Sequence, residues 1–220
     1  MAERLAPLSG VVFLVLGLLG ALVLYPSDAP DFVDEPEAIA SFYTDKGTDL
    51  LPSGLCYLLG GVFLIWFVGT LRSHLSLAEG GTGRLASIAF GGGIAATALL
   101  WASAATEVVA ALRVEENGSI DPAAATVYSD LSSILFGAAA PMGMAVLLGA
   151  SALAAFRFGA LPKWLGGLAA VIAVGCLIPF ISYFVIIISF FWVGVTGVVL
   201  YLKTAQPASS AGATRPTQPA

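Results

Sequence analysis

Six apolar stretches constrain what this chain can fold into more than any other feature. A helix that crosses the hydrocarbon core of a bilayer needs about 20 mainly apolar residues. A soluble domain carries about 25% charged residues, whereas this chain is 10% charged and 58% hydrophobic. Because a soluble fold of 220 residues needs more polar cover, we expect an all-α, polytopic transmembrane helix bundle over residues 1–203. Its expected spans are residues 8–25, 51–71, 85–112, 127–156, 164–178 and 183–202.

The last two stretches belong to one apolar run, residues 164–202, that is too long for a single crossing. As one helix it would be roughly 58 Å long, about twice the thickness of the hydrocarbon core. Pro179 lies near the middle of the run and favours a break. The sequence therefore predicts a hairpin of two helices. Five spans plus a re-entrant segment is the alternative.

The basic residues are distributed unevenly over the loops, which predicts an orientation. With the amino terminus inside, only Lys46 and Arg113 fall on the outside. The positive-inside rule then places both termini in the cytoplasm of a bacterial cell, with the bundle in its plasma membrane. A cleaved signal peptide over residues 8–25 is the rival interpretation, although no clear small-x-small cleavage site follows. The basic residues on the cytoplasmic side are Arg4, Arg72, Arg84, Arg157, Lys163, Lys203 and Arg215.

Two segments outside the predicted spans have sequence patterns that predict their own structure. Residues 204–220 are rich in Ala, Ser, Thr and Pro, which is typical of a disordered tail. Residues 36–46 place Ile39, Phe42 and Tyr43 at helical spacing between spans one and two. We expect a short exofacial cap helix here, in preference to a helix that lies on the membrane surface.

Small residues predict where the helices approach closely, because helix association in lipid depends on packing. Gly91, Gly92 and Gly93 lie in the third stretch, Gly143 in the fourth and Gly166 in the fifth. We therefore expect the third, fourth and fifth helices to form the inner core. Pro141 predicts a kink in the fourth helix.

Three runs of sequence suggest a relationship. They are Ser41-Phe42-Tyr43, Leu71-Arg72-Ser73-His74-Leu75 followed by residues 78–85, and residues 157–166 with their Leu-Pro-Lys-Trp-Leu-Gly helix start. Over residues 1–203 the chain resembles a family of uncharacterised actinobacterial six-span integral membrane proteins, a domain-of-unknown-function family. The resemblance implies the architecture, and it carries over no catalytic residue.

Glu107 is the polar residue that membrane physics singles out. It lies within the third stretch, six residues before Arg113. An ionisable side chain at the centre of a span costs about 2.5–3.5 kcal/mol on insertion scales and faces the bundle interior or a hydrated cavity. Glu107 is therefore a candidate intramembrane polar site. The alternative is a structural carboxylate near the headgroups.

Asp130 is the second member of this candidate site. A short loop joins the third and fourth helices, so Glu107 and Asp130 can flank one polar pocket that binds a cation or shares a proton. A carboxylate in the headgroup layer is the alternative for Asp130.

The two cysteines, Cys56 and Cys176, both fall in the outer third of the predicted bundle. A disulfide between them requires that their helices touch. Two separate thiols are the other interpretation, and the one we prefer.

The chain shows no pattern of an enzyme or of a cofactor site. His74 is the one histidine, and it is expected to be solvated at the membrane interface. The glycine-rich residues 79–84 lack the Gly-Lys-Ser/Thr ending of a P-loop. No basic patch suits nucleic acid. We expect no metal, no cofactor and no catalysis.

These features favour a non-enzymatic scaffold or accessory protein of the plasma membrane. Its partners would be the lipid bilayer and a membrane protein or a second copy of the chain. A small-solute or proton-linked transporter or channel that uses Glu107 is the alternative. An intramembrane enzyme that acts on lipid would need a cluster of nucleophile, base or metal ligands that the sequence does not offer.

Overall fold

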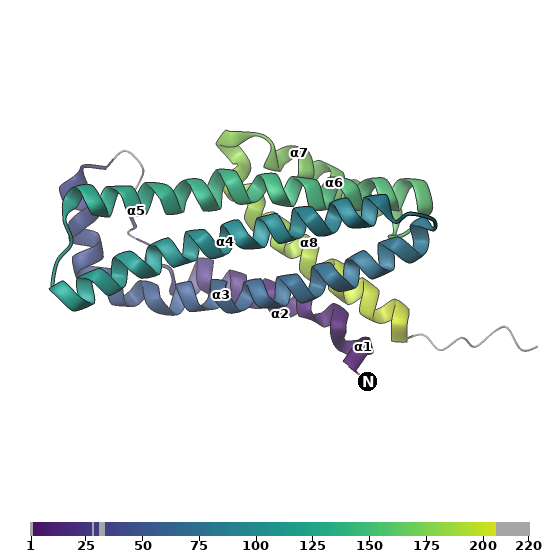
Figure 1. The fold of residues 1–220 in the computed structure, drawn as a ribbon, viewed down its shortest axis with the longest axis horizontal. Coiled ribbons are helices and arrows are strands. Elements are labelled where there is room, and N and C mark those ends of the chain that lie inside the picture. Colours follow the sequence, from purple (N-terminus) through teal and green to yellow (C-terminus); the bar gives the residue numbers. More distant parts are fainter. Residues whose placement is uncertain (1, 28, 31–33, 206–220) are drawn as a thin grey trace, which may run out of the picture.

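The computed structural model describes residues 2–27, 29–30 and 34–205. These residues form helices joined by short turns, and Figure 1 shows the longer helices packed along one another in a single bundle. In chain order the elements are α1 (Ala2–Leu5), η1 (Ala6–Leu8), α2 (Ser9–Leu18), η2 (Leu19–Leu24), α3 (Pro36–Glu79), α4 (Arg84–Asn117), α5 (Pro122–Ile134), η3 (Leu135–Ala139), α6 (Ala140–Phe158), α7 (Lys163–Cys176) and α8 (Pro179–Ala205).

Five helical segments of the described chain are long and apolar enough to cross a membrane. This confirms the predicted all-α bundle of apolar helices. The number of six spans stays a prediction, because α7 has 14 residues and is only about 21 Å long. The five segments are Ala6–Leu24, Pro36–Glu79, Arg84–Asn117, Pro122–Phe158 and Pro179–Thr204.

The long apolar run at the carboxyl end is divided beside its proline. Helix α7 ends at Cys176, and α8 begins at Pro179, four residues earlier than the sequence suggested. Proline is well suited to the first turn of a helix, because its missing N–H has no partner there in any case. Pro179 therefore starts α8 and does not lie in a separate loop.

Helix α3 is longer than predicted. It has 44 residues and a length of about 66 Å along its path, so the separate helices expected at residues 36–46 and 51–71 are one element. Figure 1 shows its first turns lying across one end of the bundle before the helix turns along it. Pro52 lies inside the helix and removes one backbone hydrogen bond, but it does not end it.

The first turns of α3 bury apolar side chains against α4 and α5. Ile39 and Tyr43 are each 1% exposed, and they pack with Val114 of α4 and Ala125 of α5. We call this group the end cluster. The burial of these side chains is what a cap helix on the bundle would show, because a helix on a membrane surface would turn them toward lipid. Its buried members are Ile39, Ala40, Phe42, Tyr43, Leu50, Ala110, Val114 and Ala125.

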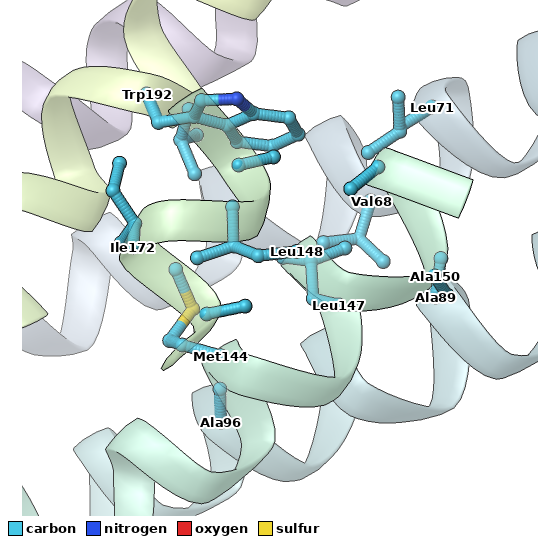
Figure 2. Packing of buried hydrophobic residues seen from close by; sticks show 14 of the residues in the cluster. Val68, Leu71, Ala89, Ala96, Met144, Leu147, Leu148, Ala150, Ile172 and Trp192 are labelled. Carbon is cyan, nitrogen blue, oxygen red and sulfur yellow. The ribbon is translucent and has the colours of Figure 1, made fainter. Parts of the chain in front are cut away.

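The main core lies between the apolar helices, and more helices contribute to it than expected. Leu64 and Phe67 of α3 and Phe190 and Trp192 of α8 are buried in it, so the inner core is not confined to α4, α6 and α7. The reason is that bulky side chains of α3 and α8 fill the space that small residues of α4 and α6 leave open. Figure 2 shows side chains of α3, α4, α6, α7 and α8 that belong to this core: Val68, Leu71, Ala89, Ala96, Met144, Leu147, Leu148, Ala150, Ile172 and Trp192.

The two ends of the described chain lie near each other. Helices α1 and η1 both contact α8, and Figure 1 places these segments toward the end of the bundle that carries the turn between α3 and α4. The end cluster lies at the opposite end. The bundle therefore has one end with the chain ends and one end with the cap.

Candidate functional site: the Glu107 cavity

Two helices depart from regular α-helical geometry beside an internal cavity. Segments η2 and η3 are π-helical, and such segments occur frequently at functional sites. Each has a backbone carbonyl that accepts a hydrogen bond from a serine of a neighbouring helix. Ser53 of α3 donates to the carbonyl oxygen of Gly20 over 3.0 Å, and Ser182 of α8 donates to that of Gly137.

Pro141 explains why the carbonyl of Gly137 needs an outside donor. Proline has no N–H, so the carbonyl four residues before it loses its helical partner. A buried carbonyl without a partner costs free energy, and the Ser182 hydroxyl supplies the missing hydrogen bond. The π-helical segment ends at Ala139, two residues before Pro141, the residue at which the sequence predicts a kink.

The cavity has a volume of about 230 Å³. Four residues of α4 face it, Leu100, Ser103, Ala104 and Glu107, and their spacing places them on one side of that helix. Helix α3 contributes a second wall and η2 with Tyr25 a third, and α5, η3 and α8 form the remainder. The lining residues from these other elements are Ala21, Leu22, Tyr25, Leu50, Ser53, Gly54, Tyr57, Ser132, Ser133, Phe136, Tyr183 and Ile187.

Hydroxyl groups surround the carboxyl group of Glu107. The Tyr43 hydroxyl donates to its Oε2 atom over 3.5 Å. The hydroxyl groups of Ser132 and Tyr25 also lie close to this carboxyl group. Since Tyr25 directly follows the end of η2, Glu107 lies at the level where the first apolar helix ends.

The hydroxyl groups of Ser103 and Ser132 connect α4 to α5 beside the cavity. The Ser103 hydroxyl donates to the backbone carbonyl of Ser132 over 3.0 Å, and the two serine Oγ atoms are also 3.0 Å apart. Both side chains are buried. This contact fixes α4 against α5 next to Glu107, so the carboxyl group is held by a rigid part of the bundle.

Aromatic rings form another part of the cavity wall. The ring centroids of Tyr57 and Phe136 are 5.8 Å apart, and those of Phe136 and Tyr183 are 5.4 Å apart. Both contacts have edge-to-face geometry, which is a preferred arrangement of aromatic pairs. The cavity therefore combines one carboxyl group, several hydroxyls and a continuous aromatic wall.

A groove adjoins the cavity. Residues 22–27 form one side of it and Lys46, Thr48, Asp49 and Pro52 form the other, with a volume of about 620 Å³. Leu22 and Tyr25 line both spaces, and Leu22 is 67% exposed. The groove and the cavity therefore adjoin at Leu22 and Tyr25, between η2 and α3.

The structure separates the residues that the sequence singled out. Glu107 lines the cavity, and Ser132 and Ser133 of α5 lie there with it. Asp130 is half-buried on the same helix and is not among the lining residues. Cys56 and Cys176 are free thiols, without the disulfide that the sequence left open.

His74 and Glu79 have structural contacts at the opposite end of the bundle. His74 is half-buried, and its Nε2 atom lies 2.9 Å from the carbonyl oxygen of Ala160 in the turn after α6, so it is not simply solvated. The carboxylate of Glu79 accepts hydrogen bonds from the N–H groups of Leu85 and Ala86 over 3.0 and 3.1 Å. It caps the start of α4 and occupies the position that a bound phosphate would take.

The aromatic wall could not be predicted from the sequence. Tyr57 and Tyr183 lie on α3 and α8 and Tyr25 directly follows η2, and each lies within or beside an apolar stretch. Tyrosine near the end of a span is common, because it suits the membrane interface. The available signal was that all three fall in the outer part of the predicted spans, at the level of Glu107.

Among known proteins, no family model, no curated protein and no solved structure matches this chain.

Proposed function

We propose that this chain is a multi-pass membrane protein that binds a small solute in the Glu107 cavity as a step in its transport. The cavity itself carries the proposal. Protein interiors are packed about as densely as organic crystals, so a space of about 230 Å³ with a carboxyl group on its wall is an exception that binding would explain. The groove beside Leu22 supports the proposal, because it adjoins the cavity at the surface of the bundle.

A scaffold or accessory role is the second candidate. The backbone contact between α4 and α6 favours it, because a Cβ atom on Gly143 would lie 2.5 Å from the backbone nitrogen of Ala96. Such close packing makes a rigid body suited to holding a partner. A scaffold does not need an internal cavity, however, and for that reason we place solute binding first.

The proposed topology has six spans in a bacterial plasma membrane, with both chain ends in the cytoplasm. A fluorescent protein fused after Lys203 is expected to fluoresce, and alkaline phosphatase at the same site is expected to be inactive, because the basic residues favour this side. Phosphatase inserted after Gly118, between α4 and α5, is the matched control and should be active. Active phosphatase after Lys203 would contradict the topology.

Solute binding is expected to raise the thermal stability of the purified protein in detergent. Phenethylammonium, 2-phenylethanol and phenylacetate represent three charge classes of nearly equal size. A bound solute at 100 times its dissociation constant stabilises by about 2.7 kcal/mol, which corresponds to a rise of roughly 5 °C or more in Tm. The measurement is the fluorescence of the tryptophans during heating.

A cavity-filling variant tests where the solute binds. Ala104 lines the cavity and is 5% exposed, whereas Val109 on the same helix is 41% exposed. Ala104→Phe should abolish the stabilisation, and Val109→Phe should preserve it. The proposal fails if none of the three solutes stabilises the wild-type protein, or if both variants respond equally.

A further inference from the structure

The charged groups on the cavity wall indicate which charge a bound solute would carry. Glu107 carries the one carboxyl group among the lining residues, and no Lys, Arg or His lines the cavity within the described chain. The hydroxyls of Tyr43, Tyr25 and Ser132 can donate to a carboxylate at this position. Hydrogen bonds stabilise the ionised form but do not neutralise it. The counter-charge must therefore come from a proton or from a bound cation.

The aromatic wall selects the kind of cation. Tyr25, Tyr57, Phe136 and Tyr183 all line the cavity together with Glu107. Ring faces attract ammonium groups within about 6 Å of their centroids, and aromatic cages are a recognised way to hold organic ammonium ions. A hard metal ion instead needs about six oxygen ligands, and the described residues contain no group of three His, Cys, Asp or Glu side chains that could hold one.

The volume limits the size of the cation. A cavity of about 150 Å³ is large enough for benzene. The present cavity of about 230 Å³ leaves room for one ring and a short chain, or for a small quaternary ammonium group. A larger cation would have to extend into the adjoining groove or displace Ser103, Ser132 or the aromatic wall, and the hydrogen bonds between Ser103 and Ser132 resist that displacement.

We propose that the Glu107 cavity binds an organic ammonium ion no larger than one aromatic ring with a two-carbon chain. The carboxylate of Glu107 is the counter-ion, and the rings of Tyr57, Phe136 and Tyr183 enclose the apolar part. This inference rests on the proposed function, because it names the class of solute for the same cavity. It goes further in assigning the charge of the solute and the residue that recognises it.

Binding of phenethylammonium and 2-phenylethanol to the full chain in detergent, measured by calorimetry, tests the proposal. The two probes match in size and differ in charge. We expect the wild-type protein to bind phenethylammonium about 10-fold more tightly than the alcohol, as one charge-assisted hydrogen bond would provide. Phenylacetate, the anionic probe, should not bind measurably.

Variants of two acids show whether Glu107 is the counter-ion. Glu107→Gln keeps the shape of the side chain, and it should weaken phenethylammonium binding about 10-fold while leaving the alcohol unchanged. Glu116→Gln is the control, because Glu116 is exposed near the end of the same helix; it should alter neither probe. Equal loss in both variants would overturn the assignment of Glu107.

A second pair of variants keeps the proposal falsifiable if Glu107→Gln does not fold. Tyr57→Leu removes a ring from the wall and should weaken ammonium binding several-fold, whereas Tyr57→Phe retains the ring and should restore it. If the alcohol or phenylacetate binds as tightly as phenethylammonium, the ammonium proposal is wrong and solute binding stands. If none of the three probes binds, both proposals are wrong.

Discussion

Gly92→Leu is expected to lower the free energy of unfolding of the bundle by roughly 3 kcal/mol or more, at the upper end of the range for overpacking. A Cβ atom at Gly92 would lie 2.6 Å from the backbone nitrogen of Leu147 and 2.8 Å from the carbonyl oxygen of Gly143. Backbone atoms cannot rotate away as a side chain can, so α4 and α6 would have to separate. In lipid, that separation removes the van der Waals contacts on which helix association depends.

Gly91 provides a matched control for this prediction. A Cβ atom there would meet nothing within 4 Å, so Gly91→Leu should leave stability within about 0.5 kcal/mol of the wild type. The measurement is unfolding of the purified protein by a denaturing detergent, followed by circular dichroism and tryptophan fluorescence. Equal stability of the Gly92 and Gly91 variants would show that the close approach of α4 and α6 does not exist.

Alanine at Trp192 is expected to have the second largest effect. Its side chain is 1% exposed, and its Nε1–H group donates to the carbonyl oxygen of Leu165 over 3.1 Å. Replacement of a large buried aromatic side chain by alanine costs about 3–5 kcal/mol in soluble cores. We expect about 2–3 kcal/mol here, because lipid already surrounds apolar groups in the separated helices and only the packing contacts and the hydrogen bond are lost.

Trp66→Ala is the control for this second prediction. Trp66 is 66% exposed on α3, so its removal leaves no internal cavity. Its stability in the same denaturing-detergent titration should stay close to that of the wild type. Equal losses in Trp192→Ala and Trp66→Ala would contradict the buried position of Trp192.

The presence and approximate place of the long apolar helices could be predicted from the sequence. A span needs about 20 apolar residues, and every long apolar stretch of the sequence became a helix. The ends of the helices were harder to predict. Helix α3 runs without a break from the predicted cap segment at residues 36–46 into the predicted span at residues 51–71, and Ile39 and Tyr43 in its first turns find partners on α4 and α5. Those partners lie more than 60 residues away in the chain, so the local sequence does not reveal them.

Glu107 was the one part of the candidate site that the sequence made predictable. Glu107 is an ionisable residue within an apolar stretch, and the cost of burying such a group drew attention to it. Tyrosine and serine residues are ordinary in membrane helices, and their convergence depends on how each helix is rotated about its axis. For the same reason the sequence could suggest Asp130 as a neighbour of Glu107 but could not show that Ser132 and Ser133 would take the places on the wall.

The cap formed by the first turns of α3 bears on how a molecule would leave Glu107. Tyr43 joins the end cluster to the carboxyl group, and Leu50 and Tyr25 belong to both the cluster and the cavity wall. Release of a solute past the end cluster would require these packed side chains to move apart. The groove between η2 and α3 requires no such rearrangement. Under the proposed function, a solute would then reach and leave Glu107 from the side of the bundle, through the groove between η2 and α3.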